Sequence, residues 1–337
     1  MRLCILYVGG QYLAQSLRQL GHAVLSVCPN PEADIPLSHP GTVRNLLEQA
    51  AGRGFTPDML FYADDGNLPL LIDPESAPCP SLYYSIDTYC NPWHLPYARG
   101  FDLVLVAQKD FLPLFTGEGL PAQWFPLFCR SADETAPFDM RDIPVAFVGT
   151  LGHKNNPGRE PFLRNFRALH PLVIRSGDFF PVFRRSRIVL NQTAFSELNF
   201  RCFEAMGCGS VLLMERCDNG LGELFTPDES ILPPYPKNNA AEAARIASSY
   251  LARPRQLAEI AENGHRLVAQ RHTSMVRAQR LTEHCRQLRA TSAHRMRLGQ
   301  ADLRRIFVRT AFGMIASELC GPRWERHRAF FHNLATH

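Results

Sequence analysis

Arg201 and Glu204 are the residues whose types and spacing point most directly to chemistry. They lie three positions apart in the run 199–209, whose pattern predicts a short helix at about 200–206 followed by a glycine turn. Residues three apart share one face of a helix, so the two side chains are neighbours. Two interpretations stay open from spacing alone. The pair is either an ordinary surface ion pair, or Arg201 holds a diphosphate while Glu204 accepts hydrogen bonds from ribose hydroxyls.

The start of this helix favours an anionic ligand. Asn199 or a neighbour is placed to cap it, and the unpaired N–H groups and positive dipole end of a helix attract anions. Arg201 lies in the first turn, where a cation disfavours the helix by roughly a few tenths of a kcal/mol. An arginine at this point is understandable if it shares an anionic ligand with the helix N-terminus.

These residues must be positioned by strands and helices, and the sequence predicts an α/β fold. Short apolar runs alternate with helical patterns, which is typical of parallel sheets with crossover helices. Strands are expected at 3–8, 23–27, 59–62, 82–85, 103–106, near 124, and at 145–148, 172–175, 188–191, 211–214 and 230–232. Helices are expected at about 11–20, 43–51, 109–115, 239–251, 254–271 and 274–290.

A length of 337 residues favours two domains, and each half opens with a strand that ends in a glycine turn, at Gly9-Gly10 and at Gly149. We expect two Rossmann-like domains whose glycine turns face a ligand cleft, because ligands bind beyond the carboxyl ends of parallel strands. Neither turn is a complete G-x-G-x-x-G, so a tight turn without a ligand explains Gly9-Gly10 equally well.

Composition excludes several other classes of protein. With 45% hydrophobic and 20% charged residues, the chain can bury real cores. The ten cysteines show no C-x-x-C spacing and are expected to be free thiols, and the histidines show no metal-binding spacing. The run 64–67, Asp-Asp-Gly-Asn, indicates a turn rather than a Ca²⁺ loop. The chain shows neither a signal peptide nor an apolar run of membrane-spanning length, so a cytoplasmic protein is expected.

Several motifs together resemble one known family. The run Asn199-Phe-Arg-Cys-Phe-Glu-Ala-Met-Gly-Cys-Gly209, with Asn219-Gly-Leu-Gly-Glu223 after it, strongly resembles the C-terminal domain of CgeB-like glycosyltransferases, which are GT-B nucleotide-sugar transferases. Further matches lie at 84–88, 101–110, 124–127, 147–149 and 271–277, so that the likeness covers about residues 80–285.

The resemblance implies two Rossmann-like domains facing across a cleft: an acceptor domain at 1–140 and a nucleotide-sugar domain at 141–285. It implies that Glu204 binds the donor ribose, that Arg201 and the turn of Gly149, Thr150 and Gly152 contact the diphosphate, and that Asn219, Gly220 and Glu223 lie near the sugar. The loop 149–159 is either a solvated connection or a phosphate cradle finished by Lys154 or Arg159. The resemblance favours the cradle, because backbone N–H groups and cations suit a leaving diphosphate.

One position departs from the family pattern. Many related retaining transferases carry a second glutamate eight residues before the ribose glutamate, but here that position is Ser196 and Glu197 is one residue away. Neither a contact of Glu197 with the sugar nor the stereochemistry of transfer follows from the sequence. If the reaction inverts the anomeric centre, Asp87 or His94 is the expected base for the acceptor hydroxyl, with Trp93 beside them. If it retains, both residues only orient the acceptor. Asp87 can equally be a simple capping residue.

The C-terminal region, residues 286–337, is expected to form a basic helical tail. Of the 33 Arg and three Lys residues, ten Arg lie in 284–337 against three acidic residues, so this region carries +7 and the rest of the chain carries −3. Two helices broken at Gly321-Pro322 are the simplest arrangement, packed back on the body as in other GT-B proteins. The alternative is peripheral contact with anionic lipid or an acidic partner.

The sequence therefore predicts a glycosyltransferase that moves a sugar from a nucleoside diphosphate sugar to an unidentified hydroxyl acceptor in a glycan, lipid-linked glycan or protein. No metal or other cofactor is required by this prediction. The alternatives are a non-catalytic protein that binds nucleotide sugars or glycans, and a sugar-nucleotide epimerase on the same fold. Nucleic acid is not expected as a partner, because the body of the chain is net negative and shows no binding motif.

Overall fold

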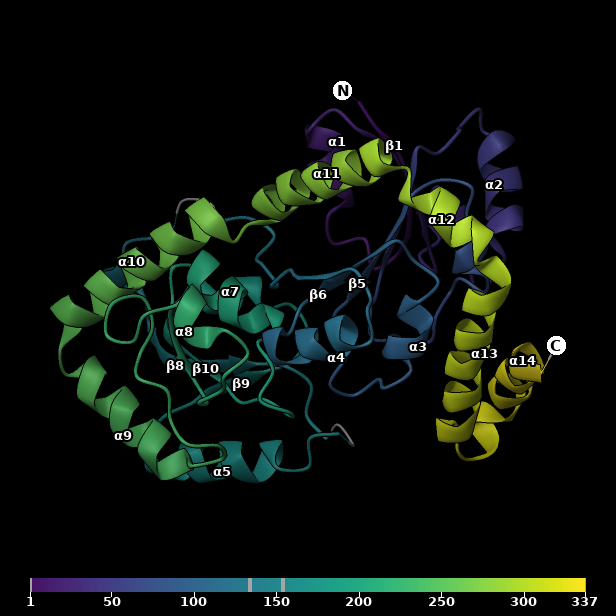
Figure 1. The fold of residues 1–337 in the computed structure, drawn as a ribbon. Helices are drawn as coiled ribbons and strands as arrows, with labels where there is room; N and C mark the ends of the chain where they lie inside the picture. Colours follow the sequence, from purple (N-terminus) through teal and green to yellow (C-terminus); the bar gives the residue numbers. More distant parts are fainter. Residues whose placement is uncertain (1, 133–134, 153–154, 337) are drawn as a thin grey trace. The chain divides into compact units, whose positions relative to one another are not determined.

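A computed structural model of the chain describes residues 2–132, 135–152 and 155–336. The chain divides into two compact units, unit 1 with residues 1–126 and 278–337, and unit 2 with residues 127–277. Each unit is a parallel sheet covered by helices, as the alternating pattern predicts (Figure 1). The domain ranges expected from the sequence follow breaks in the pattern, whereas the compact units join the C-terminal segment to the N-terminal one.

Unit 1 contains a seven-stranded sheet in the order β3-β2-β1-β4-β5-β6-β7, with every neighbouring pair parallel. Its strands are β1 (Cys4–Gly9), β2 (Ala23–Cys28), β3 (Ile35–Pro36), β4 (Met59–Ala63), β5 (Ser81–Ser85), β6 (Leu103–Val106) and β7 (Ala122–Trp124). The order reverses between β1 and β4. In sheets of this kind, the crevice beyond the carboxyl ends of the two strands at such a reversal is where ligands bind.

Helices cover both faces of the sheet in unit 1. They are α1 (Ala14–Gln19), α2 (Val43–Ala51), α3 (His94–Ala98), α4 (Leu112–Gly117), α12 (Ala293–Gly299), α13 (Ala301–Glu318) and α14 (Glu325–Thr336), with the later part of α11 (Ser274–Thr291). Short 3-10 turns lie at η1 (Pro74–Ser76), η2 (Lys109–Phe111) and η4 (Pro322–Trp324). One face of the sheet packs on α2, α3, α4 and α13 through a single apolar cluster.

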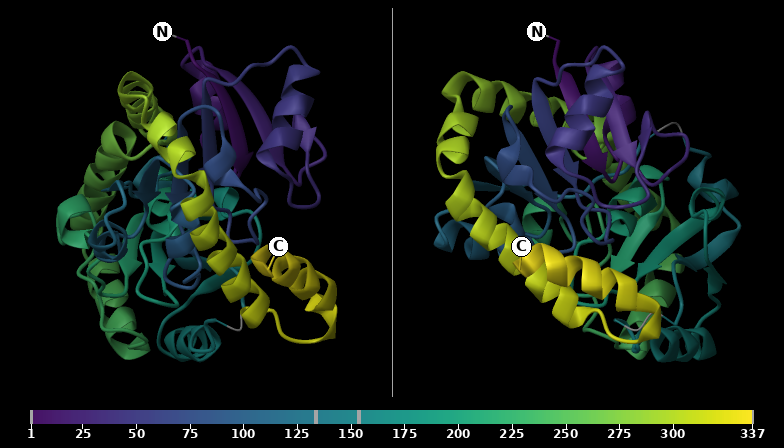
Figure 2. Two further views of the ribbon diagram at one scale, coloured as in Figure 1. Left: turned by 45° about the vertical axis from the view of Figure 1, so that its right-hand side comes forward. Right: turned by 90° about the vertical axis from the view of Figure 1, so that its right-hand side faces the viewer.

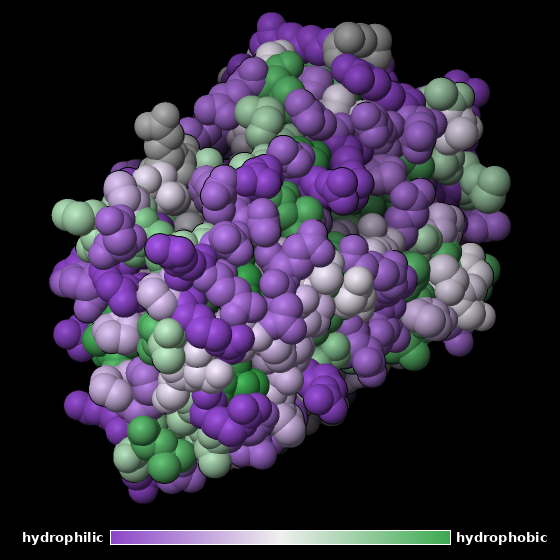
Figure 3. Space-filling view, turned by 90° about the vertical axis from the view of Figure 1, so that its left-hand side faces the viewer, coloured by the Kyte–Doolittle hydropathy of each residue, from purple (hydrophilic) through white to green (hydrophobic). Residues whose placement is uncertain are grey.

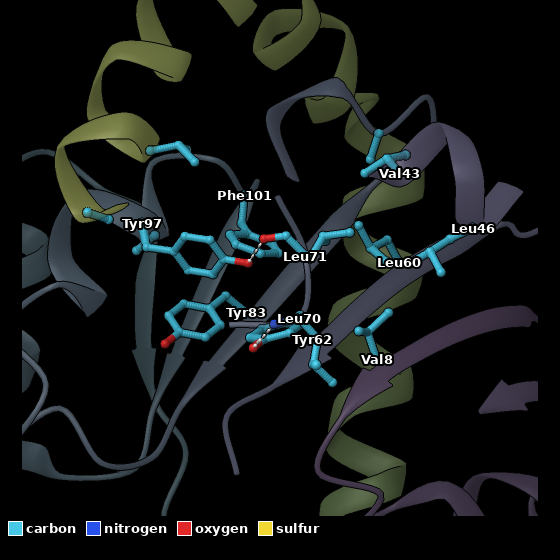
Figure 4. Close-up of a cluster of buried hydrophobic side chains, with 14 of the residues drawn as sticks. Val8, Val43, Leu46, Leu60, Tyr62, Leu70, Leu71, Tyr83, Tyr97 and Phe101 are labelled. Atoms are coloured by element: carbon cyan, nitrogen blue, oxygen red, sulfur yellow. Dashed lines mark hydrogen bonds between the residues drawn. The ribbon is translucent and has the colours of Figure 1, made fainter. Parts of the chain in front are cut away.

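Buried tyrosines are a feature of that cluster, and two of their hydroxyls make hydrogen bonds inside it (Figure 4). The Tyr97 hydroxyl donates to the carbonyl of Leu71 at 2.7 Å, and the Tyr62 hydroxyl accepts from the N–H of Leu70 at 3.2 Å. These bonds tie the irregular segment around Leu70 and Leu71 to the sheet, since a buried phenol needs a polar partner.

Unit 2 contains a four-stranded parallel sheet in the order β9-β8-β10-β11. Its strands are β8 (Ile143–Val148), β9 (Val173–Arg175), β10 (Ser186–Asn191) and β11 (Val211–Met214), and its helices are α5 (Arg159–Leu169), α6 (Phe180–Phe183), α7 (Phe200–Gly207), α8 (Leu221–Leu224), α9 (Ala240–Leu251) and α10 (Pro254–Arg271), with a 3-10 turn η3 (Phe138–Met140). One face packs on α5, α9 and α10. The order reverses between β8 and β10, which marks the crevice beyond their ends as the ligand position.

One expected strand did not form, and one short strand was not expected. Residues 230–232 do not form a strand. Leu232 donates one bond to Leu212 of β11, but Pro233 and Pro234 follow and have no N–H with which to continue a ladder. The short strand β3 was not expected, because two residues that include Pro36 give no alternating pattern.

The tail forms three helices, α12, α13 and α14, rather than two, with the expected break at Gly321-Pro322. Helices α13 and α14 lie side by side in both views of Figure 2, and α13 packs on α3. Acidic side chains from the N-terminal part of unit 1 pair with arginines of α12 and α13 and with Arg289 of α11. Arg297 bonds Asp102, Arg305 bonds Glu75, and Arg289 lies 3.2 Å from Asp58. These three arginines thus serve the packing of the tail on the N-terminal part of unit 1.

Within the described parts of the chain, every helix is too short or too polar to cross a bilayer. The face that carries α9 and α10 is mainly hydrophilic, with small separate apolar spots (Figure 3).

Candidate active site

Three loops that follow the carboxyl ends of strands gather the polar residues of unit 2. Residues 149–158 follow β8, residues 192–199 follow β10, and residues 215–220 follow β11. Because the strands are parallel, these loops all lie at the same edge of the sheet. Helix α7 begins at the end of the second loop, one residue later than Asn199.

Arg201 is held at this edge by two strands. Its Nε donates to the carbonyl of Val148 at 2.8 Å, and its Nη1 donates to Oδ1 of Asn191 at 2.6 Å. These bonds fix the guanidinium and leave Nη2 directed at Gly149, where a Cβ would lie only 2.3 Å away. Burial and the nearby charge of Arg159 lower the pKa of Arg201 to about 10, so the group stays charged at neutral pH.

A second arginine converges on the same aromatic ring. Arg159, the first residue of α5, lies 5.5 Å from the ring centroid of Phe147, and Arg201 lies 4.6 Å from it. Arg159 also donates to the carbonyl of Thr150 at 2.9 Å and to Oε1 of Gln192 at 3.0 Å. The charge of Arg159 opposes that of Arg201, and an anion that contacts both guanidinium groups relieves this repulsion.

The glycine turn after β8 contributes space more than hydrogen-bond donors. The N–H of Gly149 donates to the carbonyl of Arg175 at 3.0 Å, so that amide is occupied within the sheet. The Thr150 side chain is exposed, and Gly152 adopts φ +66°, a left-handed backbone that favours glycine. Lys154, which we expected to finish this loop, lies outside the described residues.

Glu204 lies one turn after Arg201 on α7 and is partly buried. Burial raises the pKa of its carboxyl to about 7, and the positive charges of Arg201 and Arg130 only partly oppose this shift. A carboxyl with such a pKa is poised between its charged and neutral forms at neutral pH. Raised values of this kind are characteristic of functional carboxyl groups.

Asn199 occupies the position before α7 but does not cap it as expected. Its side chain makes no hydrogen bond to a helix N–H; instead its Oδ1 accepts from Nδ2 of Asn191 at 3.2 Å. Since Asn191 also accepts from Arg201, Asn199 belongs to the support of that arginine.

The loop that carries Ser196 is held by residues after β11. Asn219, at φ +32°, donates to the carbonyl of Ser196 at 3.0 Å, and Gly220, at φ +79°, precedes α8, whose Glu223 is exposed. Glu197 is turned into its own loop, where its carboxylate accepts from the N–H groups of Ala194 and Phe195 at 3.3 and 2.8 Å.

Sequence reasoning missed a buried polar network that shapes this edge. Glu215 accepts from the N–H and hydroxyl of Thr193 and from the N–H of Asn238. Gln192 exchanges hydrogen bonds with Asn156 and donates to Asn238. The signal was present in the sequence as Gln-Thr directly after the strand expected at 188–191, and as Glu directly after the strand expected at 211–214.

In unit 1, the residues expected near an acceptor lie after β5. Asp87 is half-buried, and its Oδ1 accepts from the Tyr89 hydroxyl at 2.7 Å. His94 is 0% exposed, and burial lowers the pKa of its imidazole to about 3. Its Nδ1 lies 2.8 Å from the hydroxyl of Ser85, a position that suits support of the loop better than contact with a substrate.

Within the described residues, no group of three or more His, Cys, Asp or Glu side chains is arranged to hold a metal ion. Asp64 and Asp65 form the turn that the sequence predicts, accepting from the N–H groups of Gly66 and Asn67.

Residues 130–283 match a family described as "Glycosyl transferase-like". This stretch contains every unit 2 loop described above. Over these residues the chain is similar to that family. No curated protein matches the sequence significantly.

Solved structures show the fold of most of the chain. Sucrose-phosphate synthase from Thermosynechococcus elongatus matches with a TM-score of 0.63 and 13% identity, over 85% of this chain and 99% of that one. A glycosyltransferase from Rickettsia africae matches with 0.60 and 11% identity, over 85% and 98%. Anabaena HepE in complex with UDP-glucose matches with 0.61 and 13% identity, over 86% and 100%.

These similarities confirm the predicted GT-B fold, with its two Rossmann-like units, and the family match confirms the predicted class of the protein, a glycosyltransferase. The assignment to the CgeB-like group is finer than the family match and stays a prediction.

Proposed function

We propose that this glycosyltransferase takes its sugar from a nucleoside diphosphate sugar held at the edge of unit 2, and transfers it to an acceptor hydroxyl. Arg201 binds the diphosphate through Nη2, and Arg159 faces the same anion from the start of α5. Glu204 accepts hydrogen bonds from the ribose hydroxyls. Asn219, Gly220 and Glu223 border the transferred sugar, and Lys154 is a further candidate for the phosphates. Membership of the CgeB-like group is part of this proposal.

The observation that carries the proposal is the pair of guanidinium groups around Phe147, at 4.6 and 5.5 Å. Arg201 is fixed by two strands and has its remaining nitrogen over a glycine, which is how a protein brings an arginine against a bulky anion. As the bond to the sugar breaks, negative charge grows on the diphosphate. Fixed positive charge at this place stabilises the transition state more than the bound substrate.

Donor choice is the first point to test. HepE was solved with UDP-glucose, so UDP-sugars are the first probes. The protein is incubated with UDP-glucose, UDP-galactose, UDP-N-acetylglucosamine and the GDP- and dTDP-linked sugars, and release of nucleoside diphosphate is measured. Slow release with at least one donor supports the proposal. Interconversion of sugars indicates an epimerase, and thermal stabilisation without turnover indicates a binding protein.

Arg201 and Glu204 are tested with conservative and non-conservative variants. We expect R201K to keep the charge but lose the fixed geometry, and R201A to lose both, so turnover falls in the order wild type, R201K, R201A. E204Q weakens nucleotide binding less than E204A does, because glutamine still accepts a hydrogen bond. Unchanged kinetics in R201A and E204A together contradict the assignment.

Asp87 is the proposed acceptor-side base if the anomeric centre inverts, and otherwise it orients the acceptor. Analysis of the anomeric configuration of the product by NMR separates the two cases. The D87N variant then loses most of its turnover in the first case and retains part of it in the second.

The tail is proposed to brace unit 1, and membrane contact is the alternative. Its pairs with Asp58, Glu75 and Asp102 support bracing. Exposed Leu303 and Ile306 on α13 are the residues that a lipid surface would engage. Equal recovery of the protein on neutral and anionic vesicles removes the membrane alternative.

A further inference from the structure

Asp64 organises the ligand edge of unit 1. It follows β4, next to the reversal of strand order, and is buried. Its Oδ1 accepts from the N–H of Gly66 at 2.9 Å, and its Oδ2 accepts from the N–H groups of Asp87 and Ile86 at 2.8 and 3.3 Å. One carboxyl group therefore holds the loop after β4 and the loop after β5 together.

A buried imidazole is aimed at the same carboxyl. Nε2 of His94 lies 3.8 Å from Oδ2 of Asp64 and, among the described residues, has no hydrogen-bond partner. The other ring nitrogen, Nδ1, is hydrogen-bonded to the hydroxyl of Ser85. The Ser85 hydroxyl in turn lies 2.5 Å from the hydroxyl of Thr88. The chain of polar groups thus runs from Thr88 to Asp64 beneath the loop that presents Asp87.

Carboxylates and phenols border this edge together. Asp65 and Asp87 are half-buried, and Asp87 accepts from the hydroxyl of Tyr89. The Tyr12 ring folds over the glycine turn after β1, where a Cβ on Gly10 would lie 2.2 Å from it. Burial and the charges of Asp64, Asp65 and Asp87 raise the pKa of the Tyr12 hydroxyl, so all three carboxyl groups act on this one phenol.

We propose that this edge of unit 1, where the proposed function already places the acceptor, selects a hydroxyl-rich acceptor without negative charge near the reacting hydroxyl. The proposal rests on the proposed glycosyl transfer and names the class of its acceptor. Asp64 is a positioning residue in this scheme, because it acts through the loop that carries Asp87.

The chemistry of the edge sets this selectivity. Carboxylates accept hydrogen bonds from vicinal hydroxyls, and tyrosine rings pack on the C–H face of a sugar. A phosphate or carboxylate on the acceptor would meet Asp65 and Asp87, and like charges at short range repel each other in a partly buried site. Lys109, which follows β6 along the same edge, lies 5.0 Å from the Trp124 ring centroid, toward β7 and away from β4.

The test compares acceptors that are blocked at the same hydroxyl and differ in charge. With a donor that gives nucleotide release, the 6-O-methyl ethers of the methyl glycosides of glucose, galactose and N-acetylglucosamine are compared with the corresponding 6-phosphates. We expect the best neutral acceptor to exceed its phosphate in kcat/KM by about tenfold or more. Equal or better use of the phosphates overturns the proposal. Absence of nucleotide release with every donor contradicts the proposed function itself, which is a separate result.

Two variants link the selectivity to this edge. D65N removes one charge and keeps the turn, since asparagine also accepts from the N–H of Asn67, so the preference for neutral acceptors shrinks by about threefold or more. D64N replaces a carboxylate oxygen that accepts hydrogen bonds from two loops. The KM for the acceptor substrate should therefore rise, while UDP binding in unit 2 is unchanged. E48Q, an exposed charge on α2, is the matched control. A preference that is the same in D65N and E48Q overturns the proposal, even if D64N fails to fold.

Discussion

The guanidinium of Arg201 occupies the space that a side chain at Gly149 would need, with its Nη2 2.3 Å from the position of a Cβ. Gly149 lies at the end of β8 and Arg201 in the first turn of α7, so two distant segments are matched to each other. A glycine is thus needed at position 149 to leave space for the Arg201 side chain, whether or not the backbone of the turn donates hydrogen bonds to a ligand.

The G149A substitution tests this relationship. The new methyl group must displace Arg201, because Phe147 closes the other side at 3.1 Å. We expect the affinity for UDP to fall by about tenfold or more, which corresponds to about 1.4 kcal/mol. Isothermal titration calorimetry measures this change. G117A is the control, since a Cβ at Gly117 meets nothing within 4 Å. Equal affinities in the two variants contradict the match between Gly149 and Arg201.

Glu204 should make nucleotide binding depend on pH near neutrality. Burial raises the pKa of its carboxyl from 4.5 to about 7, so the fraction of charged carboxylate rises between pH 6 and 8. The charged form accepts ribose hydroxyls better, and UDP affinity should therefore increase over this range. The ionisation of UDP itself affects the measured affinity equally in E204Q. The pH dependence of UDP affinity in E204Q is therefore subtracted from that of the wild type. A profile in E204Q that matches the wild type removes Glu204 from the ribose site.

The same shift has a consequence for stability. A carboxyl whose pKa is higher in the folded state than in the unfolded one binds its proton more tightly when folded. The wild type should thus lose stability relative to E204Q as the pH rises from about 4.5 to about 7. Urea unfolding at pH 5 and pH 8 measures this difference. If the difference in unfolding free energy between the wild type and E204Q is the same at both pH values, the raised pKa is contradicted.

His94 should behave in the opposite sense. Burial lowers the pKa of its imidazole from 6.5 to about 3, so the folded protein resists protonation of this ring. Stability from the neutral ring is present above pH 6.5 and is lost as the pH falls toward 3. The Cε1–H resonance of His94 should not move between pH 8 and pH 5, as followed by NMR with H94Q for assignment. A midpoint near 6.5 for this resonance contradicts the buried, neutral ring.

The sequence was sufficient to predict the fold, and the reason lies in the strands. Continuous apolar runs such as 59–62 and 211–214 are typical of parallel strands buried on both faces, and each became a strand. That Arg201 and Glu204 are neighbours could be predicted because they share a helix, where spacing fixes which side chains lie together, whereas their role at a donor stays a prediction.

What the sequence could not show are relations between residues that are distant along the chain. Nothing near Asp64 indicates that its carboxyl holds the loop of Asp87, 23 residues away, and the run 64–67 by itself indicates only a turn. His94 follows an apolar strand and a polar loop like an exposed base, but its burial depends on packing against Trp93 and Tyr83. Only the folded chain brings such groups together.

Arg297 provides the sharpest test of how the tail is attached. Its side chain is 0% exposed and bonds Oδ1 of Asp102 at 3.0 Å. It also donates to four carbonyl oxygens, those of Pro74, Glu75, Ala77 and Cys79. R297M leaves Asp102 buried without its partner and removes these donors. The free energy of unfolding should therefore fall by about 3–5 kcal/mol.

Two further variants separate charge from geometry at this position. R297K keeps the charge but has only three donors for five acceptors, so we expect a loss between those of the wild type and R297M. R295Q removes an exposed charge from the same helix and should change stability little. Urea unfolding gives the free energies, and limited proteolysis shows whether the segment after Thr291 is released first. If R297M is as stable as R295Q, the tail is held by its apolar contacts with α3 and not by this arginine, because the buried acceptors would then have found other partners.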